Sequence, residues 1–182
     1  GGANYQVNYA ANNTSSITAA PLTVTAQSVS RTYDGTTAAS GSGSVGLLLG
    51  AGAGETVNTA GTQAFLDKNV GTGNKVVRAS GVTIKDSSSA DVTGNYSITY
   101  VDNATGTISQ RPSSTWIGSV SGGSWSNAAN WDALPDGNNV AAVTIGSGSA
   151  AVVYDLTTPT SLQSLNSAGR LTLAGGNLAI SG

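Results

Sequence analysis

The chain has 182 residues and a net charge of −2, and Gly, Ser, Thr and Asn together account for 87 of its residues. It contains no Cys and no His, which excludes a Ser-His-Asp triad, a thiolate nucleophile and a typical zinc site. The seven basic residues are scattered and no run of about 18 apolar residues occurs, so we expect no nucleic-acid partner, no membrane insertion, no cofactor and no catalytic residues.

The composition favours strands over helices. One Glu, three Lys and no Met leave few strong helix formers. Thr and Val suit pleated, half-buried surfaces, whereas Gly, Asn and Asp supply turns. Short apolar runs that alternate with polar residues indicate a folded chain. We therefore predict an all-β fold.

An internal repeat lies within the first 112 residues. Residues 4–21 (NYQVNYAANNTSSITAAP) match residues 95–112 (NYSITYVDNATGTISQRP) without a gap, at an offset of 91 residues. Such self-similarity is typical of modular repeat proteins. We interpret residues 1–20 as the C-terminal strands of a preceding repeat and residues 21–111 as a complete repeat. The pattern changes near Pro112, so residues 112–182 form a third region.

The complete repeat contains seven segments of alternating polarity, and seven strands favour an Ig-like β-sandwich. A β-grasp-like module is the alternative fold, but no segment shows the pattern of the helix that it requires. The predicted strands are residues 22–26, 45–49, 62–66, 75–79, 82–84, 97–101 and 105–109, with loops at residues 50–55, 67–69 and 86–90.

Beyond Pro112 the chain changes to a Trp-rich stretch followed by short alternating pieces. All three tryptophans fall within residues 116–131, and pieces such as AVVYDL, RLTLAGG and NLAISG follow between Gly, Asn and Ser residues. Pieces this short bury an apolar face only by stacking, which is typical of the rungs of a parallel β-solenoid. The pattern is still running at Gly182, so we expect further rungs.

Four stretches of the repeat carry a family pattern. They are PLTVTAQSVSRTYDGTTAA with its Tyr33-Asp34-Gly35 signature, FLDKNVGTGNKVV, VTGNYSITY and GTISQRP. As a set, these stretches resemble the YDG-type repeat of large bacterial adhesins, over about half the chain. The resemblance implies an adhesin whose repeats serve as a stalk.

The stretch from Trp116 to Asn139 resembles a second kind of sequence. It is similar to the Trp-rich entry motif that precedes β-helical passenger regions in autotransporters and in two-partner-secreted, filamentous-haemagglutinin-like exoproteins. This resemblance implies a protein that is secreted to the bacterial cell surface, with a role in adhesion or in the biofilm matrix.

Two sets of aromatic residues are expected to be structural. Asp34-Gly35 is a strong turn signal, so we expect Tyr33 to pack on the core and Asp34 to fix the turn. Tyr96 and Tyr100 are four residues apart, which places both side chains on one face of a strand, where aromatic pairs stabilise a sheet. Ligand binding is the less favoured interpretation for both sets.

The tryptophans leave two interpretations open. A bulky aromatic cap would protect the first rung of a solenoid, whose open end exposes unpaired edges. Alternatively, the rings stack on a polysaccharide or host glycan while nearby side chains hydrogen-bond its hydroxyls. The candidate glycan-binding residues are Trp116, Trp125, Trp131, Asn127, Asn130 and Asp132.

The remaining acidic stretches are interpreted as turns. Residues 67–69, 86–91 and 132–139 are rich in oxygen donors, but none matches an EF-hand loop or a calcium nonapeptide. We predict no metal site and no Lys-Asn crosslink, because all three lysines are expected to be exposed. The predicted function is a non-enzymatic stalk or spacer whose partners are neighbouring repeats or other copies of itself; the alternative is a carbohydrate-binding adhesin module.

Overall fold

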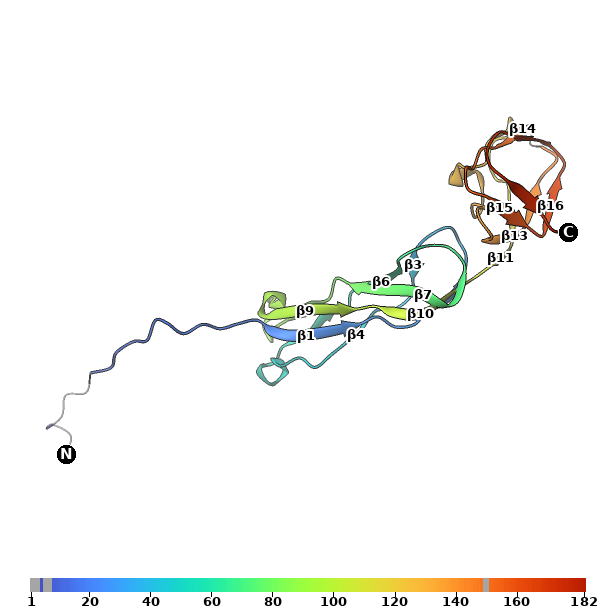
Figure 1. Cartoon of the computed structure of the whole chain (residues 1–182). Coiled ribbons are helices and arrows are strands. Elements are labelled where there is room, and N and C mark those ends of the chain that lie inside the picture. The colour runs from blue at the N-terminus through green and yellow to red at the C-terminus, as the bar shows by residue number, and fades with distance from the viewer. Residues whose placement is uncertain (1–3, 5–7, 149–150) are drawn as a thin grey trace.

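The computed structural model describes residue 4, residues 8–148 and residues 151–182. Within these residues the chain forms strands and three short 3-10 helices and no α-helix, so the all-β prediction is confirmed. The strands form two β units that follow one another end to end, preceded by an extended stretch (Figure 1). No helix of the described residues is long and apolar enough to cross a membrane.

The first unit comprises the strands up to Ser109. Among the described residues these are β1 (Ala20–Thr25), β2 (Ser30–Thr32), β3 (Ala38–Ala39), β4 (Ser44–Val45), β5 (Thr56–Thr59), β6 (Thr62–Phe65), β7 (Gly71–Ser80), β8 (Thr83–Lys85), β9 (Tyr96–Val101) and β10 (Asn103–Ser109), with 3-10 helices η1 (Ala51–Ala53) and η2 (Thr93–Asn95).

These strands build a three-stranded sheet in the order β4-β1-β9, a five-stranded sheet in the order β2-β10-β7-β6-β3 and a β5-β8 pair. β1 runs parallel to β9 and β2 runs parallel to β10. The path β1-β2 therefore follows the path β9-β10 from one sheet into the other. Both sheets turn alternate side chains inward, as the sequence alternation predicts.

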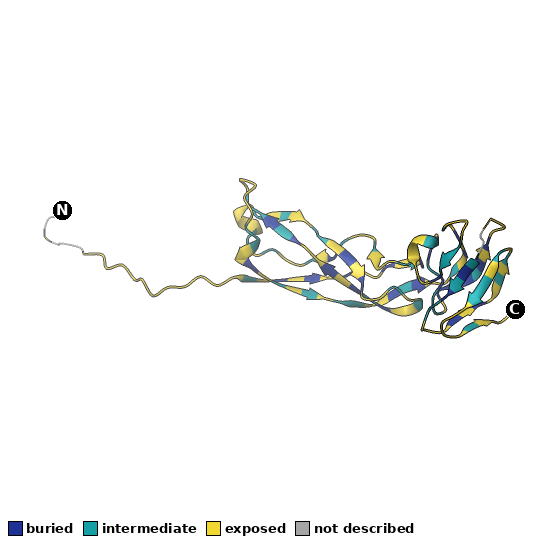
Figure 2. Cartoon of the chain, turned by 90° about the horizontal axis from the view of Figure 1, so that it is seen from above, coloured by how far each residue is buried: buried dark blue, intermediate teal, exposed yellow. Residues whose placement is uncertain are grey.

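The core of the first unit lies between these sheets (Figure 2). Leu22 and Val24 of β1 are buried, whereas Thr23 and Thr25 between and beyond them are exposed. The same alternation buries Phe65 in β6 and Val77 in β7. Six of the predicted strands, those near β1, β6, β7, β8, β9 and β10, correspond to observed strands.

Residues 45–49 are the clearest error in the strand predictions. β4 covers only Ser44–Val45, and Leu47 and Leu49 are 79% and 61% exposed. The apolar run GLLLG therefore lies outside any strand, with Leu47 and Leu49 on the surface and only Leu48 packed against the core. The sequence also gave no signal for the short strands β2, β3 and β5, which bury few side chains.

The second unit begins at Arg111, and Gln110 is the single residue between it and β10. Its elements are β11 (Arg111–Thr115), β12 (Gly123–Ser124), the 3-10 helix η3 (Ala128–Asn130), β13 (Val140–Ile145), β14 (Ala151–Tyr154), β15 (Thr160–Leu162), β16 (Ser164–Ser167), β17 (Arg170–Leu173) and β18 (Leu178–Ile180).

These strands form three parallel sheets, in the orders β11-β13-β16, β12-β14-β17 and β15-β18. Each sheet contributes inward side chains to one core, among them Val143, Ile145, Val152 and Leu162. Tyr154, which is fully buried, donates its hydroxyl proton to a backbone carbonyl, either that of Thr158 (3.3 Å) or that of Asn177 (3.0 Å).

Burial predicts which apolar residues hold the second unit together. Replacing the buried Ile145 with Ala should lower the free energy of unfolding by about 2–5 kcal/mol, because it leaves a cavity in the core. Ile117→Ala is the matched control, since Ile117 is 61% exposed. All three tryptophans lie in this unit, so urea titration followed by Trp fluorescence measures its unfolding. Equal losses for the two variants would contradict the burial assignment.

Candidate functional site

The Tyr33-Asp34-Gly35 motif forms a bend directly after β2. The Asp34 carboxylate accepts hydrogen bonds from the backbone N–H and the hydroxyl of Thr36, both at 2.8 Å, and pairs with Arg31. Gly35 has a φ of +85°, which glycine adopts without a steric penalty. This bend orients Tyr33, whose side chain is fully buried.

The Tyr33 hydroxyl contacts the second unit. It lies 3.0 Å from the carbonyl oxygen of Leu134 and 2.9 Å from Asp136 Oδ1, both of which are acceptors. Lys68, which follows β6, donates to the same hydroxyl at 3.2 Å and forms an ion pair with Asp136. Tyr33 of the YDG motif and Lys68 of the DKN segment (residues 67–69) therefore both contact the Asp136 carboxylate of the second unit. We call this end of the first unit the YDG–DKN end.

Asn139 makes the other contact between the units, and it is only 1% exposed. Its Oδ1 accepts from the backbone N–H of Val70 at 2.8 Å, and its Nδ2 donates to Asn69 Oδ1 at 3.0 Å and to Asp136 Oδ1 at 2.7 Å. Both donors and the acceptor of the amide are thus used, as a buried amide requires. We call Tyr33, Lys68, Asn69, Asp136 and Asn139 the junction network.

The charge states of the junction network follow from its burial and hydrogen bonds. Burial opposes ionisation of Asp136, but hydrogen bonds from Lys68, Asn139 and Tyr33 outweigh it and hold the pKa of this carboxyl below its ordinary value. Burial, and then the hydrogen bond to Asp136, raise the pKa of the Tyr33 phenol. Near neutral pH, Tyr33 is therefore a neutral donor and Asp136 an anionic acceptor.

The tryptophans form a buried cluster rather than an open platform. Trp116, Trp125 and Trp131 are 6%, 0% and 3% exposed. The ring centroids of Trp116 and Trp131 are 5.1 Å apart, those of Trp125 and Trp131 are 4.6 Å apart, and Trp125 packs against Tyr154 at 5.3 Å. Because the ring faces are covered by one another and by the core, they are not available to stack on a sugar.

The indole N–H groups and the three predicted polar neighbours also act within the fold. Trp125 and Trp131 each donate to a backbone carbonyl at 2.8 Å. Asn127 accepts from the N–H of Ala129 at 3.1 Å and so caps η3. Asn130 donates to the carbonyl of Ser124 at 2.8 Å.

Asp132 joins both ends of β11 to the loop that follows η3. It accepts from the hydroxyl of Ser114 at 2.7 Å, from the N–H of Thr115 at 3.0 Å and from the Arg111 guanidinium at 3.0 Å. The carboxylates of Asp132 and Asp136 are thus each paired with a cationic side chain of this chain.

Tyr96 and Tyr100 lie at the edge of the first unit's core. Tyr96 is 7% exposed, donates to Glu55 and accepts from the N–H of Gly50 at 3.0 Å. Tyr100 is partly buried and accepts from the N–H of Val82 at 3.1 Å. Their repeat equivalents differ, because Tyr9 is 94% exposed and Tyr5 lies outside the described residues.

The sequence did not identify Lys68, Asp136 or Asn139 as functional residues. Lys68 was expected to be exposed, but it is partly buried in the junction. The same expectation is wrong for Lys75, which is 8% exposed and pairs with Asp67. The DKN segment belongs to the repeat pattern, yet nothing in the sequence places it opposite Asp136.

One family comparison bears on this geometry. A YDG domain is found at residues 18–105. The match covers the first unit as far as β10 and includes both the Tyr33 and the Lys68 sides of the junction network. The YDG part of the family prediction is therefore confirmed. Searches of the curated proteins and of the solved structures gave no match.

The lowered pKa of Asp136 predicts a pH dependence of stability. Because its pKa is lower in the folded than in the unfolded chain, its contribution is fully present above the unfolded pKa and is lost as the pH falls through the folded value. At neutral pH, Asp136→Asn should cost about 1.5–3 kcal/mol, the range for hydrogen bonds to charged groups.

The difference between the unsubstituted chain and Asp136→Asn should therefore shrink below about pH 4, near the ordinary pKa of an aspartate. Urea titrations at a series of pH values measure it. Asp102→Asn is the control, because Asp102 forms an exposed pair with Arg78 and should contribute less. A difference that is constant or grows on acidification would contradict the assignment.

Proposed function

We propose that the chain is a non-enzymatic structural spacer of a secreted bacterial surface adhesin. The observation that carries this proposal is the junction network, which fixes the YDG domain end to end against the second unit (Figure 2). A partly buried ion pair and a fully hydrogen-bonded buried amide define one orientation between the two units. A spacer needs a defined orientation to project what it carries.

The finer architecture is also part of this proposal. We infer that the YDG domain is an Ig-like β-sandwich, since two sheets enclose its core and its first strand runs parallel to a late strand. We infer that the second unit begins a parallel β-solenoid. Its three parallel sheets, each extended by a later strand, support this inference.

The placement at the cell surface rests on resemblance. YDG-type repeats and Trp-rich motifs resemble parts of filamentous-haemagglutinin-like, two-partner-secreted exoproteins, and the YDG domain agrees with that origin. A role in adhesion or in the biofilm matrix then belongs to the whole protein, with this chain holding other parts at a distance. Its partners are neighbouring repeats or other copies of the chain.

A carbohydrate-binding module is the alternative function, and the structure gives it little support. The three tryptophans on which it depends are buried, and Asn127, Asn130 and Asp132 are engaged in hydrogen bonds within the second unit. A glycan would have to open the core of the second unit to reach the ring faces.

The spacer proposal predicts that the two units keep one orientation in solution. Small-angle X-ray scattering of the full chain should fit the end-to-end arrangement of Figure 1. Tyr33→Phe, Lys68→Gln and Asn139→Ala together should let the units move relative to one another and should reduce the maximum dimension, because the hydrogen bonds and the ion pair that the junction network makes between the units are then all lost.

Arg78→Gln is the control, since the exposed Arg78–Asp102 pair lies within the YDG domain. It should leave the scattering curve unchanged. If the unsubstituted chain already samples folded-back conformations, or if the junction variant scatters like the control, the junction does not hold the units and the spacer proposal fails.

Buried tryptophans predict weak quenching and no response to glycans. Iodide should quench the Trp fluorescence of the folded chain much less than that of the urea-unfolded chain, because all three rings are at most 6% exposed. Adding bacterial or host polysaccharides should not change the quenching. Strong quenching that one polysaccharide relieves would favour the carbohydrate-binding function instead.

A further inference from the structure

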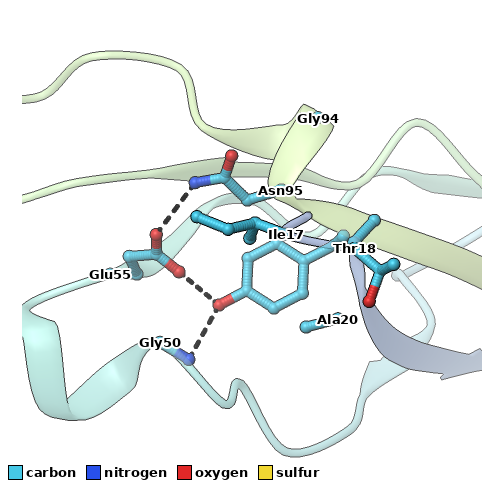
Figure 3. Close-up of a pocket in the computed structure, with 9 residues that line it drawn as sticks. Ile17, Thr18, Ala20, Gly50, Glu55, Gly94 and Asn95 are labelled. Carbon is cyan, nitrogen blue, oxygen red and sulfur yellow. Dashed lines mark hydrogen bonds between the residues drawn. The ribbon is translucent and has the colours of Figure 1, made fainter. Parts of the chain in front are cut away.

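The end of the YDG domain opposite the junction carries a hollow of about 450 Å³ (Figure 3). One wall is the segment Ile17–Ala20 and the others come from Gly50, Glu55 and Gly94–Tyr96. The Glu55 carboxylate accepts hydrogen bonds from the Tyr96 hydroxyl and from Asn95 Nδ2, the latter at 3.3 Å. Glu55 is the only Glu of the chain.

Strand register relates this hollow to the junction. In the second unit, β11 runs parallel to β13 and Arg111 pairs with Val140, the residue directly after Asn139. In the YDG domain, β1 runs parallel to β9 and Ala20 pairs with Tyr96, the residue directly after Asn95.

The 91-residue repeat aligns Ala20 with Arg111. Asn95 therefore occupies the position at the start of the YDG domain that Asn139 occupies at the start of the second unit. Each of these amides also donates through Nδ2 to a carboxylate, Asn139 to Asp136 at 2.7 Å and Asn95 to Glu55 at 3.3 Å.

The two amides differ in what covers them. Asn139 is 1% exposed because Asn69 and Val70 of the YDG domain hydrogen-bond to it. Asn95 is exposed, and no YDG-type end lies against it in this chain. Asn95 thus occupies the position equivalent to that of Asn139, but within the described residues no segment equivalent to Asn69 and Val70 covers it.

The extended segment that leads into the hollow shows the same contrast, although it forms no strand between residues 8 and 19. Ile108 is fully buried, whereas its repeat equivalent Ile17 is 103% exposed. The local turn nevertheless persists. Thr14 donates its N–H (2.9 Å) and hydroxyl (2.6 Å) to Asn12 Oδ1, and Thr105 does the same to Asn103 at 2.9 Å and 2.8 Å.

We propose that the hollow around Asn95 and Glu55 is the docking site for the YDG–DKN end of another copy of the YDG domain. In this arrangement the incoming Lys68 pairs with Glu55, and the incoming Asn69 and Val70 bind the Asn95 amide as they bind Asn139 here. The proposal deepens the spacer function and rests on it, since it names the partner that continues the array.

Charge and register both favour this occupant. The YDG–DKN end presents an ammonium group and a backbone N–H, and the hollow presents a carboxylate and an exposed amide. At the junction, the phenol that contacts the Asp136 carboxylate is Tyr33 of the preceding domain. At the hollow, Glu55 already accepts a hydrogen bond from Tyr96 of its own domain, and Tyr96 occupies the register position of Val140.

A tandem chain tests the proposal. A second copy of residues 21–111 is inserted after Arg111 of the full chain, so that the first copy precedes the hollow of the second. The chain has no Cys, so spin labels attach only at introduced cysteines, Asn74→Cys in the first copy and Gly52→Cys in the second. Gly52 has open space around it, and Asn74 is exposed.

Double electron–electron resonance then measures the spread of distances between the two copies. The reference is the single chain labelled at Asn74→Cys and Leu173→Cys, which spans the existing junction. We expect the tandem distribution to be as narrow as the reference. Glu55→Gln with Asn95→Ala in the second copy should at least double its width.

The same two substitutions in the first copy are the matched control and should leave the width unchanged, because no domain precedes that copy's hollow. Lys68→Gln in the first copy, which leaves the receiving domain unsubstituted, should broaden the distribution as the second-copy substitutions do.

A broad distribution in the unsubstituted tandem, or one that neither set of variants changes, would overturn the docking proposal. A narrow distance distribution in the reference chain combined with a broad one in the tandem chain would overturn the docking proposal but leave the spacer function standing. A broad distance distribution in the reference chain would contradict the spacer function itself. The width of the distribution in the tandem chain would still test the docking proposal.

Discussion

The buried amide of Asn139 is the constraint on which the arrangement of the two units depends. It satisfies the backbone N–H of Val70 and the side chain of Asn69 on one side of the junction, and it holds Asp136 in place for Lys68 and Tyr33. An amide at this depth is costly to leave without partners, so small displacements of one unit against the other lose several hydrogen bonds together. This makes the junction a specific contact rather than a flexible linker.

The junction also gives the family signature a physical role. The turn made by Asp34 and Gly35 orients Tyr33, and the hydroxyl of Tyr33 then meets a carboxylate that belongs to the next unit. Residues that stabilise the turn within the YDG domain therefore also determine what that domain can bind at its end. The Trp cluster fills the neighbouring part of the second unit and supports the loop that carries Asp136, because Trp125 donates to the carbonyl of Pro135.

How much of this could be predicted depended on how local each feature is. Alternation revealed β1, β6, β7, β8, β9 and β10, because inward-facing side chains alternate with more exposed ones along each strand. It failed for the exposed run around Leu47 and for short strands such as β3, which bury too little to leave a pattern. Tyr33 was recognised from its turn. Its partner Asp136 is 103 residues away, and only the packing of whole units brings the two together.

The parallel pairing of β1 with β9 has a mechanical consequence. Both strands lie along the long axis of the molecule, with the chain entering at Ala20 and leaving beyond Ser109 (Figure 1). Tension applied along this axis pulls the paired strands past one another, so the ladder of six residue pairs from Ala20–Tyr96 to Thr25–Val101 is loaded all at once. Hydrogen bonds loaded in shear rupture together rather than one by one, so this geometry resists extension along the axis.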